Sequence, residues 1–192
     1  MRMDATRSGA AAATGERRRI ARGLVRTGPM KTLLVVWHSM TGGTQQMVQA
    51  AAAGAAAEPA VQLRLRHASA AAAQDLLDAD AYLFATPENL AAMAGLMKDF
   101  FDRAYYPVLG RIEGRRYATL VCAGSDGSGA ARQIERIATG WRLQAAAPPL
   151  IVCTHAQSAQ AILAPKHIAE GDLQRCRELG AALAAGLALG VF

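Results

Sequence analysis

The sequence W-H-S-M-T-G-G-T-Q-Q-M occupies residues 37–47 and follows the apolar run from Leu33 to Val36. Hydroxyl residues and the pair Gly42-Gly43 stand where a strand would end and a helix would begin. The first N–H groups of a helix have no partner within the helix, so they can bind an anion at such a turn. The glycines let the backbone approach a ligand closely. The stretch therefore predicts a phosphate-binding turn between a strand and a helix.

The residues around the glycines narrow the choice of anion. No lysine follows them, as it does in the loops that bind nucleotide triphosphates, and their spacing is not G-x-G-x-x-G. We therefore expect one phosphate monoester, held by neutral donors that include the hydroxyls of Ser39, Thr41 and Thr44. The alternative is an ordinary glycine-rich turn in which Thr44 caps the helix.

From residue 31 onward, apolar runs alternate with helical patterns. The expected strands are 33–37, 61–66, 81–85, 117–123 and 150–154, and the expected helices are 45–57, 70–77, 96–106, 130–139 and 172–189. This alternation predicts an α/β fold, a five-stranded parallel sheet with helices on both faces. We expect the strand order 2-1-3-4-5, because it gathers the polar loops after strands one, three and four at one edge, where ligands bind in such sheets.

The loop A-T-P-E-N-L-A-A-M-A-G, residues 85–95, follows the third strand. Pro87 is expected to turn the chain directly after that strand. Glu88 and Asn89 offer polar groups to the edge of a heterocycle, and Leu90 and Met93 could contact a flat ring. For Met93, ordinary core packing is an equal alternative.

The loop G-S-D-G-S-G, residues 124–129, follows the fourth strand. Its backbone could wrap the edge of a ring, and Asp126 could accept a hydrogen bond from a ring or a ribityl hydroxyl. The alternative is a flexible turn in which Ser128 caps the next helix.

Charge divides the 192-residue chain into two parts. Residues 1–29 hold seven arginines and two acids, so they carry five of the six net positive charges. We predict a disordered basic extension over 1–29, with an organelle-targeting segment as the alternative, and one domain over 30–192. The near-neutral domain implies no nucleic-acid surface, and no apolar run reaches the ~20 residues of a membrane span.

The spacing of the cysteines and histidines argues against disulfide and metal sites. The three cysteines are far apart, which favours reduced buried thiols in a cytoplasmic protein. The four histidines lack metal-ligand spacing, so no metal is expected. A serine hydrolase built from Ser39, Asp126 and His155 is a remote alternative, because the G-x-S-x-G context is missing.

Two segments resemble a known family. H-S-M-T-G-G-T-Q-Q-M is similar to the FMN phosphate loop of the flavodoxin-like superfamily. T-P-E-N-L-A-A-M-A-G-L-M-K-D-F-F-D-R resembles a segment of its NAD(P)H-dependent FMN reductase branch, which includes WrbA-like quinone reductases. The resemblance covers residues 31–190 and implies a flavodoxin-like fold with non-covalent FMN. The cofactor contacts that it implies are Ser39, Met40, Thr41, Gly42, Gly43 and Thr44 at the phosphate, Pro87, Glu88, Asn89 and Leu90 along the ring, and Gly124, Ser125 and Asp126 near its pyrimidine side.

The resemblance implies an FMN-dependent oxidoreductase in which NADH or NADPH is the electron donor and a quinone or similar small molecule is the acceptor. Since the flavin carries the chemistry, no side chain is expected to be catalytic. Ala94 departs from the family, in which a serine often stands at this position. The alternatives are a flavodoxin-like electron carrier, disfavoured because the loops at 86–95 and 124–129 hold no aromatic side chain, and a cofactor-free scaffold. A homo-oligomer, a dimer or tetramer, is expected.

Overall fold

The computed structural model describes residues 30–192. The predicted disordered extension, 1–29, lies outside these residues. Every helix in the described part of the chain is too short or too polar to cross a lipid bilayer.

One sheet forms the middle layer of the molecule. Its main strands are parallel and run in the order β2-β1-β3-β5-β6, with β7 also paired to β5. The predicted order 2-1-3-4-5 is thus confirmed, and the fifth position is shared by two short strands. The bounds of these strands are β1 Lys31–Trp37, β2 Val61–His67, β3 Ala81–Asn89, β5 Arg116–Ala123, β6 Gln144–Ala145 and β7 Leu150–Cys153.

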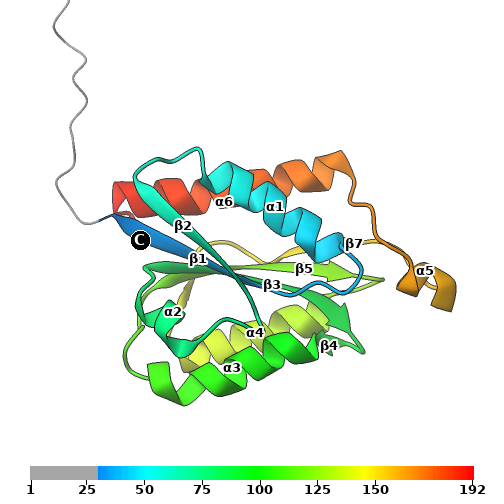
Figure 1. The fold of residues 1–192 in the computed structure, drawn as a ribbon, viewed down its shortest axis with the longest axis horizontal. Coiled ribbons are helices and arrows are strands. Elements are labelled where there is room, and N and C mark those ends of the chain that lie inside the picture. The colour runs from blue at the N-terminus through cyan, green and yellow to red at the C-terminus, as the bar shows by residue number, and fades with distance from the viewer. Residues whose placement is uncertain (1–29) are drawn as a thin grey trace, which may run out of the picture.

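Helices cover both faces of the sheet (Figure 1). Helices α1 (Gly43–Ala55) and α6 (Glu170–Leu189) lie on one face. On the opposite face lie α2 (Ala73–Leu77), α3 (Gly95–Val108) and α4 (Ser128–Gly140). A short helix, α5 (Ala159–Leu163), projects beyond the end of the sheet where β7 ends (Figure 1). The flavodoxin-like three-layer arrangement expected from the sequence is present.

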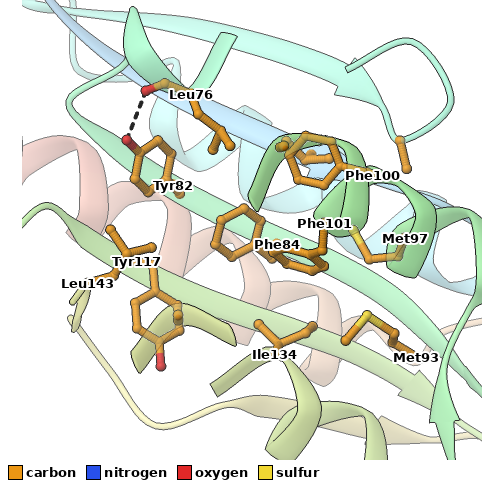
Figure 2. Packing of buried hydrophobic residues seen from close by; sticks show 14 of the residues in the cluster. Leu76, Tyr82, Phe84, Met93, Met97, Phe100, Phe101, Tyr117, Ile134 and Leu143 are labelled. Carbon is orange, nitrogen blue, oxygen red and sulfur yellow. Dashed lines mark hydrogen bonds between the residues drawn. The ribbon is translucent and has the colours of Figure 1, made fainter. Parts of the chain in front are cut away.

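The two faces are packed with different side chains. Between α1 and α6, a Cβ on Gly180 would collide with the carbonyl oxygen of Ala51, so the two helix backbones are nearly in contact. The other face holds large aromatic side chains, among them Phe84 and Phe101, whose ring centroids are 5.1 Å apart (Figure 2). Met93 is 4% exposed and packs in this aromatic core. Of the two alternatives for this residue, core packing is therefore correct and contact with a flat ligand ring is not.

Tyr82 lies within the aromatic core (Figure 2). Its hydroxyl donates a hydrogen bond of 2.9 Å to the carbonyl oxygen of Leu76. Burial raises the pKa of Tyr82 to about 12, so the phenol remains protonated. This hydrogen bond satisfies the polar group that would otherwise be costly in the core.

The third strand is longer than predicted. It does not break at Thr86-Pro87 but continues to Asn89 and folds back as the antiparallel strand β4 (Ala92–Met93). Pro87 is accommodated because pairing with β1 ends at Ala85, so one flank of the strand has no ladder there. The turn instead lies at Leu90 and Ala91, whose φ angles are 51° and 59°.

Other boundaries differ less. The second helix spans 73–77 rather than 70–77, and the carboxylate of Asp75 accepts a hydrogen bond from the N–H of Ala72 at its start. Helix α5 and strands β4 and β6 were not predicted, because elements of two to five residues are too short to show a periodic pattern.

Candidate functional site

The loops after β1 and β5 and the last residues of β3 converge at the carboxyl edge of the sheet, as the strand order predicts. With the segment after β7 they enclose a cavity of about 120 Å³. The predicted site residues that line it are Ser39, Met40, Thr41, Gly43, Thr44, Pro87, Glu88, Asn89 and Gly124.

The loop after β1 meets the N-terminus of α1 at this cavity. Gly42 caps the helix with φ 84°, a left-handed conformation that glycine adopts without strain, and its N–H donates to the hydroxyl of Ser39 at 3.2 Å. Thr44 is 1% exposed, and its hydroxyl oxygen is without a hydrogen-bond partner among residues 30–192. A buried hydroxyl beside unpaired helix N–H groups is suited to binding an anion.

Gly43 lies in close contact with β5 and with the chain that follows α5. A Cβ at this position would lie 2.5 Å from Sγ of Cys122 and 3.3 Å from Cβ of Lys166. The second glycine of the motif is therefore required for the backbone of α1 to approach β5 this closely.

We call residues 164–169, between α5 and α6, the strap. Its backbone is bonded to the loop after β1: the N–H of Lys166 donates to the carbonyl oxygen of Thr41 at 2.8 Å. The side-chain amide of Gln46 donates to the carbonyl oxygens of Gly42 at 3.1 Å and Lys166 at 2.7 Å. Its oxygen accepts from the N–H of Ile168 at 3.2 Å. Gln46 thus joins the strap to α1.

Lys166 gives the cavity a cation that the sequence-based expectation of neutral donors missed. Its side chain lines the cavity, and its ammonium donates to the carbonyl oxygens of Ala161, Ile162 and Ala164 at 2.7, 2.8 and 2.7 Å. These carbonyls lie in and just after α5, so the ammonium caps the C-terminal end of that short helix.

The carboxylate of Glu88 is used within the protein. It accepts hydrogen bonds from the N–H groups of Gly127, Gly129 and Ala130 at 2.8, 3.1 and 3.4 Å. These groups belong to the N-terminus of α4, so Glu88 caps that helix from the neighbouring strand. The cap that the sequence suggested for Ser128 is therefore wrong, because its hydroxyl bonds to the carboxylate of Asp126 at 2.5 Å.

Four predicted residues do not line the cavity. They are Gly42, Leu90, Ser125 and Asp126. Gly42 lies behind the loop as the cap of α1, whereas Leu90 is fully exposed at the tip of the β3–β4 hairpin. Ser125 and Asp126 are exposed on the loop after β5.

A contact between two loops lies at the cavity wall. The amide nitrogen of Asn89 is 2.9 Å from Sδ of Met40, which links the hairpin to the phosphate loop. A planar ligand that binds between the hairpin and the loop after β1 would have to break this contact.

Several lining residues were not predicted from the sequence: Cys122, Ala123, Thr154, Ala156, Ile162, Leu163 and Lys166. Cys122 and Ala123 end β5, and the others come from the chain after β7. Burial raises the pKa of the Cys122 thiol to about 11, so this thiol remains protonated and unreactive at neutral pH. In the sequence, only the position of Cys122 at the end of a predicted strand could have suggested that this residue lines the cavity.

Two histidines lie beside the phosphate loop, at the ends of β1 and β2. Nδ1 of His38 is 3.1 Å from Nε2 of His67. Burial, and next the neighbouring His67, lower the pKa of His38 below its usual value. No cluster of three or more histidine, cysteine, aspartate or glutamate side chains within residues 30–192 could hold a metal ion.

Comparison with known proteins agrees with this fold. The family described as NADPH-dependent FMN reductase matches residues 62–157. A flavodoxin of Aquifex aeolicus (strain VF5) is 32% identical over 100 residues, which are 52% of this chain and 52% of that protein. The chain thus spans about half the length of this curated relative. The family match includes the β3–β4 hairpin, whereas the phosphate loop and the strap lie outside it.

Solved structures resemble the whole fold. A flavodoxin from the domain Archaea has a TM-score of 0.66 and 19% identity, over 81% of this chain and 98% of that one. A flavodoxin, WrbA-like protein from Agrobacterium tumefaciens has a TM-score of 0.62 and 18% identity, over 83% and 98%. At these identities the likeness concerns the fold alone.

Proposed function

The chain belongs to the NADPH-dependent FMN reductase family, and on this premise we propose that it binds FMN non-covalently and uses NADH or NADPH to reduce a quinone or a similar small acceptor. The bound flavin would supply the electron- and hydride-transfer chemistry that no protein side chain provides.

The observation that carries this proposal is the unpaired hydroxyl of Thr44. It is buried at the N-terminus of α1, where an anion is favoured, and it lines the cavity. Burying a hydroxyl without a partner costs about 1–3 kcal/mol, so a site in which no protein group pairs with it is suited to a ligand. A phosphate oxygen bonded to this hydroxyl and to the N–H groups of Gly43 and Thr44 would meet that need.

The rest of the cavity fits the slender part of the cofactor. Its volume of about 120 Å³ is below the ~300 Å³ at which ligand pockets begin, so it suits a phosphate and the adjoining chain better than a complete flavin. The flat ring would lie at the cavity mouth, against Met40, Pro87 and Asn89, and Gly124 would face it from the loop after β5. Leu90, Ser125 and Asp126 remain predicted contacts that would need loop movement to reach it.

The protein's own part in the reaction is binding and orientation. Glu88 fixes the hairpin against α4, which holds Pro87 and Asn89 in place at the mouth. Backbone N–H groups of the loops after β3 and β5 would stabilise negative charge on the ring. No side chain is assigned as a general acid or base.

Titration of the purified protein with FMN, followed by its absorption bands, tests binding, and steady-state oxidation of NADH and NADPH with several quinones tests the reaction. We expect tight FMN binding and quinone-dependent oxidation of at least one nicotinamide. A protein that binds no FMN and oxidises neither nicotinamide would rule the proposal out.

A second candidate, an electron carrier without its own NAD(P)H activity, is favoured by the 32% identity to a flavodoxin. Anaerobic mixing of the FMN-loaded protein with NADPH separates the two. Direct bleaching of the flavin band supports the reductase, whereas bleaching that needs an added reductase supports the carrier.

We also propose that the protein is cytoplasmic and acts as a homo-oligomer, a dimer or a tetramer. The three free cysteines suit a reducing compartment, and the exposed Tyr106 and Leu109 suit burial against a second copy. Analytical ultracentrifugation of the FMN-loaded protein would give the subunit number.

A further inference from the structure

The ammonium of Lys166 caps α5 but stands at the cavity where the phosphate is proposed to bind. We propose that Lys166 is a ligand of that phosphate: when FMN binds, the ammonium leaves the carbonyl oxygens of α5 and pairs with the phosphate at the N-terminus of α1. This inference rests on the proposed FMN site and adds to it a charged contact that also controls α5.

The backbone of Lys166 is fixed beside the loop after β1. The N–H of Lys166 is bonded to Thr41 and its carbonyl oxygen to Gln46, at 2.8 and 2.7 Å. Its Cβ is 3.3 Å from the position that a Cβ would take on Gly43. The rest of the side chain can therefore move, and it can place the ammonium either at the carbonyl oxygens of α5 or beside an anion at the start of α1.

The charge of the phosphate needs a cation. A phosphate monoester carries about −1.5 to −2 charge at pH 7, and neutral hydroxyls and N–H groups do not balance it. Among the side chains that line the cavity, Lys166 carries a positive charge and Glu88 a negative one. Glu88 is bonded to three N–H groups of α4, so its charge is stabilised away from the phosphate end. The electrostatic balance favours movement of the ammonium toward the phosphate.

The carbonyl oxygens of α5 and the phosphate would compete for one cation. All three protons of the ammonium are donated to carbonyl oxygens of residues 161–164, which is the full capacity of a lysine. Pairing with a phosphate therefore removes at least one of these bonds. Since α5 has five residues and buries none of them, it depends on its caps, and loss of the lysine cap should loosen it.

Riboflavin has the same ring and ribityl chain as FMN but no phosphate, so it separates the phosphate contact from the ring contacts. We would measure the Kd of both flavins by fluorescence quenching for the wild type, Lys166→Met, Lys166→Arg and Lys31→Met. Lys31 pairs with Asp80 at the opposite end of the sheet, so its replacement is a control of equal charge change.

Loss of one charge-assisted bond should raise the Kd for FMN about tenfold in Lys166→Met and leave the Kd for riboflavin unchanged. Lys166→Arg should retain most of the FMN affinity, and Lys31→Met all of it. Added salt should weaken FMN binding to the wild type more than to Lys166→Met. An unchanged FMN affinity in a folded Lys166→Met protein would overturn the inference and leave the proposed function intact. A wild type that binds neither flavin would overturn both.

Hydrogen exchange tests the effect on α5 separately. The N–H groups of Ile162 and Ala164 are bonded to Ser158 and Gln160 at 2.8 and 3.0 Å. In the wild type these amides should exchange faster with FMN than with riboflavin bound, and the difference should vanish in Lys166→Met. Equal or slower exchange with FMN would show that the lysine does not leave α5, which contradicts the proposed movement.

Discussion

The loop after β1, where we propose that a phosphate binds, and the β3–β4 hairpin line the same cavity but are held in place by different contacts. The loop is fixed by close backbone contacts, with Gly43 against Cys122 and Gln46 bonded to the strap. The hairpin is fixed against α4 mainly by side-chain acceptors: the carboxylate of Glu88 accepts three N–H groups of α4, and the side-chain oxygen of Gln133 accepts the N–H of Met93. Its tip is strained, because Leu90 and Ala91 both have positive φ angles.

Because their contacts differ, the loop after β1 and the hairpin should differ in their tolerance to substitution. A steric fit allows no side chain to be added, so the proposed phosphate end should accept one kind of ligand group and few substitutions. The side chain of Leu90 is fully exposed at the tip of the hairpin, so it can vary, and the proposed ring end can change its contacts with an acceptor without loss of the fold. Four substitutions test this difference, beginning with the one of largest expected effect.

Glu88→Ala should lower the free energy of unfolding by about 2 kcal/mol, because it leaves N–H groups at the N-terminus of α4 without their charged acceptor. Urea unfolding of the apoprotein measures this loss. Glu135→Ala, which truncates an exposed carboxylate on the same helix, should change the stability by less than about 0.5 kcal/mol. Equal losses in both variants would contradict the capping role of Glu88.

Gly43→Ala should lower stability by about 1–2 kcal/mol, because its Cβ would lie 2.5 Å from the buried Sγ of Cys122. It should also weaken FMN binding if the thiol rotates into the cavity. Adding Cys122→Ala should restore stability, which tests whether that contact is the cause. Gly95→Ala, where a Cβ would meet nothing within 4 Å, should instead stabilise helix α3 by about 0.5–1 kcal/mol.

Thr44→Val keeps the shape of the side chain but removes the unpaired hydroxyl. The stability of the apoprotein should stay equal or rise, while the Kd for FMN should increase about tenfold. Thr41→Val is a companion change at a half-buried position and should weaken FMN binding less. Unchanged FMN affinity in the Thr44 variant would refute the phosphate assignment.

Leu90→Asn combined with Ala91→Gly should have the smallest effect, a gain of about 0.5–1 kcal/mol, because these residues adopt left-handed conformations more readily. Thermal unfolding measures the gain. FMN affinity should remain unchanged if Leu90 stays at the exposed tip. A weaker affinity would instead support the ring contact that the sequence predicted for Leu90.

The main strands and helices could be predicted because the hydrophobic pattern of each repeats along the chain. Alternating strands and helices gave the parallel sheet and its order, and the glycine-rich stretch after Val36 gave the turn at the first strand. Predictions were wrong where a tertiary contact replaced a local preference. Pro87 was expected to turn the chain, but it lies within β3, where pairing with β1 has already ended.

The sequence by itself determined the fold, the edge of the sheet that holds the cavity and the hydroxyl residues after β1 that line it, since these follow from hydrophobic period and from short-range turn chemistry. Only the tertiary structure decided that Glu88 caps α4 and that Lys166 stands beside Gly43. These placements join segments some 40 to 120 residues apart, and no local pattern records which distant backbone a charged side chain will meet.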